Sequence, residues 1–295
     1  MLSLKMMKNK MILQNNFLTV EIATFGAEIK SILDNQYNEW MWNANPNFWG
    51  KTSPILFPIV GSLKNNTFIY KGENYSLSRH GFARDMEFDT EQVSQTKAVF
   101  TLKANEKTLV NYPFYFELKV IYQLQNKQLS CTYEVTNIGN ETMYFSIGGH
   151  PAFALGKDAT DFENFYLEFN NDDVINRLKL VDGLISENKE IINLNNQQLP
   201  LHYDLFKEDA MVFRDLKSNA ITIKNTKNEN KLTLTFDNFT HFGIWTVQNA
   251  PFICLEPWFG MADSQNHNQH IEDKEGMIAL QPQQVFAKSW NITIE

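Results

Sequence analysis

The sequence lacks the features that mark an exported, membrane-bound or nucleic-acid-binding protein. Only two of its 295 residues are cysteine, and Cys131 and Cys254 both lie in apolar alternating runs, which favours buried free thiols over a disulfide. Met1–Met11 holds no apolar run as long as a signal peptide or membrane span requires. Basic residues cluster only around Lys5–Lys10, and the formal net charge is −8, so no phosphate backbone is expected to bind. We therefore expect a cytoplasmic protein with no nucleic-acid or membrane partner.

Long helical patterns and linker-like segments are also lacking. The only helical patterns are brief, at Glu106–Tyr112 and Tyr203–Asp209, which disfavours a mixed parallel α/β fold. Because 43% of the residues are hydrophobic, the chain can bury one large core. We expect a single domain over residues 1–295, with 1–11 as a poorly ordered or edge segment. A monomer and a homodimer both fit, since alternation does not reveal whether edge strands pair.

Apolar and polar residues alternate with a period of two along the chain, which indicates half-buried strands. Asn, Gly and Asp clusters such as Lys71–Asn74 and Asn137–Asn140 separate these runs and predict hairpins. The length implies more strands than a seven-stranded sandwich holds. We predict an all-β fold, a large antiparallel β-sandwich with the site on a concave face or rim. The clearest runs are Phe116–Val120, Leu129–Val135, Ile221–Ile223 and Leu232–Phe236.

Glu256 follows the apolar run Phe252–Leu255 and precedes Pro257. Proline has no N–H for a ladder, so we predict that the strand ends there and that the carboxylate projects from a sheet edge. Trp258 and Phe259 follow, and aromatic faces beside a carboxylate suit a sugar, whose C–H surface is stacked while its hydroxyls are hydrogen-bonded. The alternative is that Glu256 only caps a turn.

His150 follows Gly148 and Gly149 and precedes Pro151. The glycines permit a tight backbone and a close ligand approach, and the proline stops the strand, so the imidazole is predicted to sit at a corner. A satisfied core histidine is the alternative for an isolated residue. The presence of a second histidine motif and of Glu256 favours the functional interpretation.

His80 and Arg84 flank Gly81–Ala83 after a predicted strand at Tyr75–Ser78, so an exposed loop is expected to present both. His80 is suited to orient a hydroxyl or share in proton transfer. Arg84 is suited to hold a hydroxyl or an anionic substituent, the alternative being an ion pair with Asp85 or Glu87.

The spacing of His267 and His270 invites a metal interpretation. No cysteine or second acidic ligand lies at metal-site spacing, and a polar Asn/Gln/His loop is usually solvated, so no metal site is predicted. His202 and His241 have no evident partner in the sequence.

Two histidines and a glutamate provide the groups that open and reclose a sugar ring. A base removes the proton of the hydroxyl at C1 while an acid protonates the ring oxygen, which releases an open-chain aldehyde. A carboxylate suits the base and an imidazole the acid, with each pKa expected to move toward neutrality through burial and the partner's charge.

In this order, the motifs Ser53–Gly61, His80–Arg84, Gly149–Phe153 and Glu256–Trp258 resemble the aldose 1-epimerase (galactose mutarotase) superfamily, and most of all its LacX-like branch. The resemblance covers roughly Asn16–Ile294. Each motif alone is weak, but the set is specific. It implies the β-supersandwich fold of galactose mutarotases, a hexose ligand and no cofactor.

The resemblance also implies roles for individual residues. Glu256 is the expected general base on the anomeric hydroxyl, and His150 the expected general acid toward the ring oxygen, with His80 assisting in binding. An aspartate between the second histidine and the glutamate holds a hydroxyl in the family. Asp209 matches that position best, and Asp204 is the rival.

The chain departs from the family pattern at Ser62, where many relatives carry an arginine that reaches the sugar. Arg84 matches an arginine that phosphosugar-specific relatives use, and Lys51 stands roughly where they have another. Since this basic set is partial, a neutral hexose is favoured over a hexose 6-phosphate. Phe82 and Trp258 complete the expected substrate contacts.

Two further functions are compatible with the sequence. A carbohydrate-binding or sensing protein would keep the site without turnover, which intact His150 and Glu256 disfavour. Glycoside hydrolysis usually needs two carboxylates flanking the scissile bond, and only Glu256 has a convincing position, with Asp209 as the alternative second carboxylate.

Overall fold

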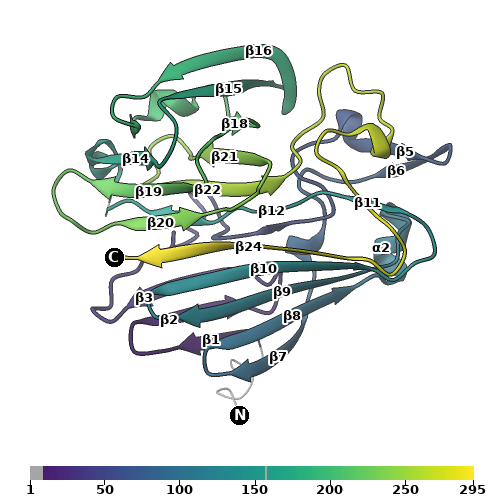
Figure 1. Ribbon diagram of the computed structural model, residues 1–295, viewed down its shortest axis with the longest axis horizontal. Coiled ribbons are helices and arrows are strands. Elements are labelled where there is room, and N and C mark those ends of the chain that lie inside the picture. The colour runs from purple at the N-terminus through teal and green to yellow at the C-terminus, as the bar shows by residue number, and fades with distance from the viewer. Residues whose placement is uncertain (1–8, 157) are drawn as a thin grey trace.

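The computed structural model describes residues 9–156 and 158–295, and these form mostly antiparallel strands (Figure 1). Two large sheets contain most of the strands. A nine-stranded sheet has the spatial order β17 (Gln198–Pro200), β14 (Phe165–Phe169), β19 (Ala220–Asn225), β20 (Leu232–Thr235), β24 (Val285–Ile294), β10 (Gln128–Asn137), β9 (Phe116–Gln125), β8 (Lys97–Lys103), β7 (Asp89–Ser94). An eight-stranded sheet has the order β16 (Leu184–Asn193), β15 (Val174–Val181), β18 (Met211–Phe213), β21 (His241–Trp245), β22 (Phe252–Phe259), β12 (Ile147–Gly149), β4 (Ile55–Leu56), and β13 (Ala152–Ala154) also pairs with β22.

Three smaller sheets and a few short helices complete the described residues. The sheets are β1 (Lys10–Gln14), β2 (Leu18–Ala23) and β3 (Ile29–Asp34); β5 (Thr67–Tyr70) and β6 (Glu73–Ser76); and β11 (Met143–Phe145) and β23 (Ile278–Leu280). Within residues 9–156 and 158–295 the structure has the α-helix α2 (Glu106–Asn111) and the 3-10 helices η2 (Lys64–Asn66), η3 (Ala83–Asp85), η4 (Ala159–Asn164), η5 (Tyr203–Phe206) and η6 (Ile271–Asp273). No helix among the described residues is long and apolar enough to cross a membrane.

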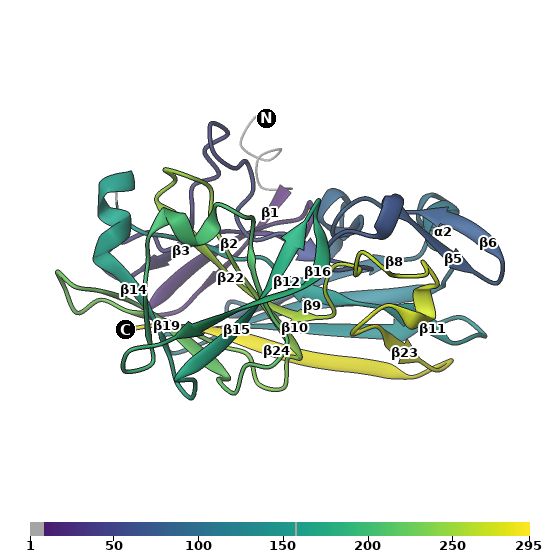
Figure 2. The same cartoon turned by 90° about the horizontal axis from the view of Figure 1, so that it is seen from above.

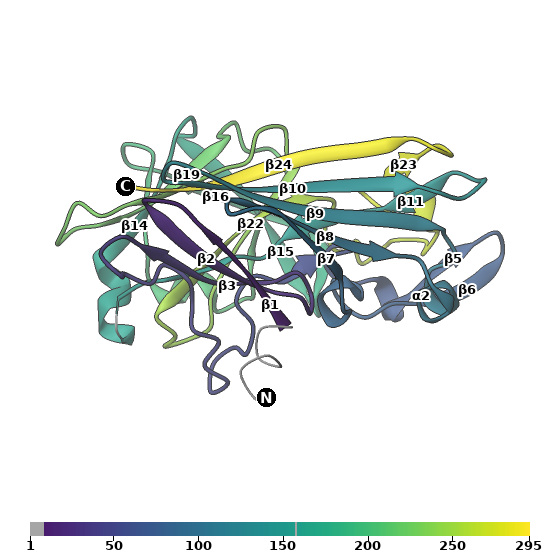
Figure 3. The same cartoon turned by 90° about the horizontal axis from the view of Figure 1, so that it is seen from below.

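The arrangement confirms the predicted all-β sandwich. Strands β24, β10, β9, β8 and β7 run side by side (Figure 3), and the hairpin of β15 and β16 stands at the opposite side of the molecule, in front of β22 and β12 when seen from above (Figure 2). One large apolar core joins the sheets, with Leu118 and Tyr133 from the nine-stranded sheet, Phe242 and Leu255 from the eight-stranded sheet and Val20 from β2.

Strand β22 separates this core from the candidate site. Successive side chains of a strand point to opposite faces, so Ile253 and Leu255 enter the large core. Cys254, Glu256 and Trp258 face the other way, where smaller apolar clusters surround them. The site therefore occupies the face of the eight-stranded sheet that the nine-stranded sheet does not cover.

Local signals account for most of the short elements. Helix α2 begins where the Asn105 side chain accepts hydrogen bonds from two backbone N–H groups of its first turn, as an N-cap does. The second predicted helix, Tyr203–Asp209, is only the 3-10 helix η5. Lys71 and Gly72 have φ of 52° and 82°, as a type I′ turn requires, and they join the β5–β6 hairpin.

The predicted hairpin at Asn137–Asn140 is wrong, and the predicted N-terminal segment is only partly described. Asn137–Asn140 does not form a hairpin: the Asn137 side chain donates to the carbonyls of Glu141 and Leu280, and the chain passes to β11 in another sheet. Of the expected N-terminal segment, residues 1–8 lie outside the described part, and Lys10 begins β1, an edge strand of its three-stranded sheet.

Candidate active site

Glu256 lies inside a continuous strand rather than at its end. Strand β22 runs through Pro257 to Phe259 and is flanked by β21 on one side and by β12 and β13 on the other. The prediction of a strand end and a sheet-edge carboxylate is therefore wrong. β12 pairs with β22 at Trp258 and β13 pairs with it up to Cys254, so Glu256 lies opposite the break between them. An interrupted ladder is where a strand accommodates proline, which has no N–H to donate.

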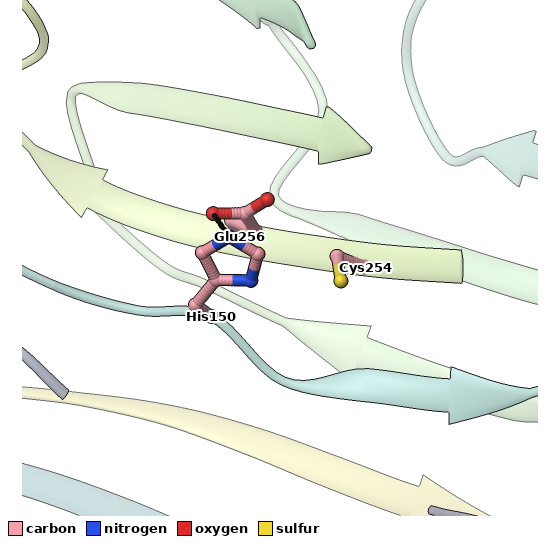
Figure 4. A group of neighbouring side chains, drawn as sticks. All are labelled: His150, Cys254 and Glu256. Atoms are coloured by element: carbon pink, nitrogen blue, oxygen red, sulfur yellow. Dashed lines mark ion pairs between the residues drawn. The ribbon is translucent and has the colours of Figure 1, made fainter. Parts of the chain in front are cut away.

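His150 occupies that break. Gly149 precedes it, and a Cβ added there would lie 2.8 Å from the Tyr133 hydroxyl, so only glycine lets β12 approach the nine-stranded sheet this closely. The imidazole Nε2 is 3.2 Å from Oε2 of Glu256, and Figure 4 shows the two side chains facing each other. Trp49 stacks on the imidazole, with ring centroids 4.9 Å apart, and Trp245 meets it edge-on at 5.6 Å.

Burial disfavours the charge on both members of this pair. Glu256 is 1% exposed, and burial raises the pKa of its carboxyl well above the ordinary value, with the negative Asp209 adding to the effect and the positive Arg79 opposing it. Burial lowers the pKa of His150 to about 3. The expectation of pKa values moved toward neutrality is correct in direction for Glu256 and wrong for His150, because desolvation shifts an acid upward and a base downward.

The prediction that an exposed loop presents His80 is wrong: the side chain is buried. The His80 backbone is left-handed with φ 69°, and Gly81 packs so closely on Phe57 that an added Cβ would meet the Phe57 carbonyl oxygen. Burial lowers the pKa of His80 well below its ordinary value, so the ring is neutral. The Gly61 N–H donates to Nδ1 at 3.1 Å, which leaves the proton on Nε2. Arg79 Nε also donates toward the ring, to Nε2 at 3.3 Å, but a neutral imidazole has only one acceptor nitrogen. Because the rigid Gly61 N–H holds Nδ1 as that acceptor, we assign the donor to Nε2.

A cavity of about 270 Å³ opens beside the pair. His80, His150 and Glu256, the three residues predicted to carry the chemistry, all line this cavity. A larger cavity of about 750 Å³, whose walls include Tyr37, Trp40 and Phe165, has no histidine in its lining and so cannot hold such a pair. The smaller cavity is lined by Trp49, Arg79, His80, Arg84, His150, Asp209, Ala210, Trp245, Glu256 and Trp258.

Trp258 forms one wall of the cavity. Its ring covers Gly148 on β12 and Gly243 on β21, where an added Cβ would come within 2.4 Å of ring atoms. Nδ1 of His150 is buried and has no hydrogen-bond partner among the described residues, and Oε2 of Glu256 is buried with the His150 imidazole as its polar neighbour at 3.2 Å. Nε1 of Trp258 is also buried, beside the Glu256 carboxyl. Buried polar atoms are normally fully paired, so this cluster at one cavity is typical of a site that a polar ligand completes.

Asp209, and not Asp204, lies in this cavity. Asp204 is exposed and paired with Lys207 at 2.7 Å. Oδ2 of Asp209 is 3.6 Å from Nη1 of Arg79. The geometry thus separates two candidates that the sequence left open.

Arg79, Trp49 and Trp245 also line the cavity, and none of them is among the residues predicted to form the site. Arg79 adjoins the His80 motif, which was an available signal. Trp49 and Trp245 lie far apart in the sequence, outside the motifs, and meet at a centroid distance of 5.4 Å only because the sheets bring their segments together.

Three predicted substrate contacts need correction or refinement. Phe82 does not line the cavity, because its ring packs in the core against Phe57 and Phe116. Lys51 does not line it either, and its ammonium is 3.0 Å from Asp85. Arg84 does line the cavity. Its Nη2 donates to the Arg79 carbonyl at 2.7 Å, and its Nε is 3.6 Å from Asp85. The ion pair with Asp85, the alternative to a substrate contact, is therefore present.

Three of the four remaining histidines are explained by local contacts, and His202 is exposed. Nδ1 of His267 is 3.3 Å from the buried Asp263 carboxylate, and Nδ1 of His270 is 3.9 Å from Glu272. His241 is buried, and its Nδ1 accepts the Gly260 N–H.

Cys254 lies two residues before Glu256 on β22, to its right in Figure 4. Donor atoms of Cys254, His150 and Glu256 lie within 4.8 Å of one another. Burial raises the pKa of the Cys254 thiol well above its usual range, whereas metal binding requires the thiolate. The thiol packs with Ala152 and Phe252, and we assign it to the apolar support of the site. Cys131 is likewise buried and free, as predicted.

Buried histidines are expected to make the fold sensitive to mild acid. Burial lowers the pKa of His150 to about 3 and that of His241 to about 4, whereas an unfolded histidine titrates near about 6.5. Below that pH the unfolded chain binds protons at these positions that the folded protein excludes, so the contribution of the histidines to stability is complete above it and is lost as the pH decreases. The urea midpoint of wild type should decrease from pH 7.5 to 5.5, and that of His241→Asn should decrease less. The control His202→Asn, at an exposed histidine, should show the same decrease as wild type. A midpoint constant over this range would contradict the prediction.

Comparison with known proteins identifies the family and the fold of this chain. A sequence profile of the aldose 1-epimerase family matches residues 9–278. The chromosomal LacX protein of Lactococcus lactis subsp. lactis is 36% identical over 293 residues, covering 96% of this chain and 98% of the relative. A galactose mutarotase related enzyme from Lactobacillus acidophilus superposes with a TM-score of 0.93 at 35% identity over 97% of each chain. A galactose mutarotase-like protein from Lactobacillus casei superposes with a TM-score of 0.90 at 27% identity, over 97% of this chain and 100% of that chain.

Proposed function

This chain belongs to the aldose 1-epimerase family, and from that premise we propose that it interconverts the α and β anomers of a neutral hexose such as glucose or galactose. The observation that carries the proposal is the buried carboxyl–imidazole pair of Glu256 and His150, 3.2 Å apart at the wall of a small cavity. Proton transfer at two oxygens of one ring needs two such groups held together. The proposed reaction is an isomerisation that needs no cofactor.

In the proposed mechanism, Glu256 removes the proton of the hydroxyl at C1 while His150 donates a proton to the ring oxygen. The bond between C1 and the ring oxygen breaks, and the C1–O bond becomes the carbonyl of the open-chain aldehyde. Rotation about C1–C2 exposes the other face of the carbonyl. The protons then return along the same path, so each residue acts once as acid and once as base.

The buried position of the pair favours one stage of this cycle. The two residues share one mobile proton, and ring opening converts an ionised carboxylate and imidazolium into an uncharged acid and base. Burial raises the pKa of Glu256 and lowers that of His150, so it favours this uncharged state, which accompanies the open-chain aldehyde. The fold thus assists proton transfer in the direction of ring opening.

Three polar side chains around the pair are suited to hold hydroxyls. His80 offers a donor at Nε2, while Arg79 and Asp209 offer a donor and an acceptor that face each other at 3.6 Å. Trp258 and Trp245 supply flat apolar walls for the C–H surface of a sugar. Ser62, which stands where many relatives carry an arginine, is absent from the lining, and Arg79 supplies a guanidinium there instead.

A hexose 6-phosphate is the second candidate substrate, because both Arg79 and Arg84 line the cavity. Each nearby cation already has an acidic neighbour: Arg79 faces Asp209, and Arg84 and Lys51 both approach Asp85. A phosphate dianion would have to compete with these carboxylates, so the neutral sugar remains the favoured substrate.

The test is the rate of anomer exchange for glucose, galactose and glucose 6-phosphate, followed by polarimetry and NMR. Acceleration with a neutral hexose is the expected result. Acceleration with the phosphosugar alone would transfer the proposal to the second candidate. Binding without acceleration would indicate a sensor, and cleavage of a disaccharide would indicate a hydrolase, so either would contradict the proposed mechanism.

Asp209→Asn is expected to move the acid limb of the pH–rate profile to lower pH. The Asp209 charge raises the pKa of Glu256, so neutralising it lets Glu256 ionise at lower pH and act as a base there. The profile of kcat/KM against pH reports this value for the free enzyme. Asp204→Asn is the matched control, since Asp204 is exposed and lies outside the cavity. An acid limb that stays in place in Asp209→Asn would refute the electrostatic coupling.

A further inference from the structure

A buried arginine outside the cavity reaches the turn that carries Asp209. Arg177 lies on β15 and is 4% exposed. Its Nη2 donates to the Asp209 backbone carbonyl at 3.3 Å, and its Nη1 is 3.5 Å from Oε2 of Glu190 on β16. A buried guanidinium is costly unless it is paired. Nε of Arg177 is buried without a hydrogen-bond partner, so the Asp209 carbonyl and Glu190 are the groups that hold this charge among the described residues.

Asp209 has a backbone conformation that requires support. Its φ is 76°, in the left-handed region that residues other than glycine adopt at a cost. Its Oδ1 accepts the N–H of Ala210 at 2.8 Å, and its Oδ2 is directed toward Arg79. The direction of the carboxylate therefore depends on how this turn is held.

Strand pairing places Arg177 where it can hold the turn. Leu178 on β15 pairs with Val212 on β18, directly after the Asp209 turn. The neighbours of Leu178 on β15 both reach back to that turn: Arg177 binds the Asp209 carbonyl, and the Lys179 ammonium is 2.9 Å from Glu208. The Lys179 pair is exposed to solvent, and exposed ion pairs contribute little.

We propose that Arg177 is a positioning residue that holds the Asp209 peptide, so that the Asp209 carboxylate faces Arg79 and the sugar hydroxyls in the cavity. The inference rests on the proposed function, and it extends the sugar-binding apparatus to the β15–β16 hairpin. Arg177 does not line the cavity and acts only through Asp209.

Kinetics of Arg177→Met, Arg177→Lys and the matched control Lys179→Met test the proposal. Arg177→Met should raise KM roughly tenfold, the size expected for one charge-assisted hydrogen bond, with kcat nearly unchanged. Arg177→Lys keeps the charge and should recover part of the loss, while Lys179→Met should behave as wild type. An unchanged KM in folded Arg177→Met would overturn the proposal.

A double-mutant cycle shows whether Arg177 acts through Asp209. In an Asp209→Ala background, Arg177→Met should raise KM no further, because the positioned carboxylate is already absent. An equal effect in both backgrounds would overturn the proposal and indicate a general structural role.

Hydrogen exchange gives a readout that does not depend on turnover. The Ala210 amide, which donates to Asp209 Oδ1, should exchange faster in Arg177→Met than in wild type and Lys179→Met. Unchanged exchange would refute the positioning role even if no sugar were accepted. If wild type neither turned over nor bound a sugar, while the Ala210 amide still exchanged faster in Arg177→Met, the proposed function would be refuted and the positioning role of Arg177 would stand.

Discussion

Glu256→Gln is expected to lower kcat by about 10²–10⁴-fold, the usual contribution of one positioned proton-transfer group. Glutamine keeps the shape of the side chain and its place on β22 but cannot accept the C1 proton or return it. Because Glu256 is 1% exposed and enclosed by Trp258 and the His150 corner, no water-borne base can reach the same position without rearrangement. The KM should change little, since glutamine can still hydrogen-bond the C1 hydroxyl and the other proposed hydroxyl contacts come from other residues. Anomer exchange measured by NMR, with binding followed by tryptophan fluorescence, tests both expectations.

The same substitution has an expected effect on stability with a defined sign. The pKa of Glu256 is raised by burial, so above the ordinary carboxyl pKa the unfolded chain ionises at this position while the folded protein does not, and folding loses stability as the pH rises. Glutamine removes this loss. The thermal midpoint of Glu256→Gln should therefore exceed that of wild type at pH 7.5 and approach it near pH 4.5. Glu141→Gln, at an exposed glutamate, is the control and should show no such gain. Full activity in Glu256→Gln would exclude Glu256 as the base.

His150→Asn is expected to produce a loss of kcat of similar size, about 10²–10⁴-fold, because ring opening then lacks its acid. Asparagine retains a polar group at the corner after Gly149 but cannot exchange a proton with Glu256 across the 3.2 Å gap. Trp49 loses its stacking partner, so a modest rise in KM is expected besides the fall in kcat. Single-turnover anomer exchange separates the two effects.

The matched control for this prediction is His202→Asn, which alters an exposed histidine outside the cavity and should leave turnover unchanged. In the double variant with Glu256→Gln, the losses should be far from additive, because residues that act as one unit fail together. Additive losses would indicate that the two groups serve separate steps. Turnover retained in His150→Asn would assign the acid to another group, with His80 Nε2 the nearest candidate.

The sequence by itself determined the fold class and singled out Glu256 and His150, the two side chains of the proposed reacting pair. Period-two alternation with glycine, asparagine and proline interruptions leaves few folds other than a large antiparallel sandwich, because each half-buried strand must cover a core with one face. The glycines before His150 and the aromatic residues after Glu256 marked those residues as unusual, since glycine permits close approach and a carboxylate beside tryptophan is seldom needed for packing. Family resemblance in the motifs then suggested a common chemistry.

Only the tertiary structure decided the surroundings of that pair, because they depend on contacts between distant segments. The proline after Glu256 suggested a strand end, yet β22 continues, since its partner strands change from β12 to β13 beside that point. Phe82 shared a motif with His80, yet it packs into the core, while Trp49 and Trp245 enter the site from segments with no motif.

The direction of the His150 pKa and the support of Asp209 by Arg177 also depend on three-dimensional burial. Sequence neighbours specify which side chain follows which, whereas desolvation and ion pairing depend on which side chains share the same volume. The residue types of the proposed chemistry could therefore be predicted from the sequence, whereas their protonation and orientation depend on how the sheets pack.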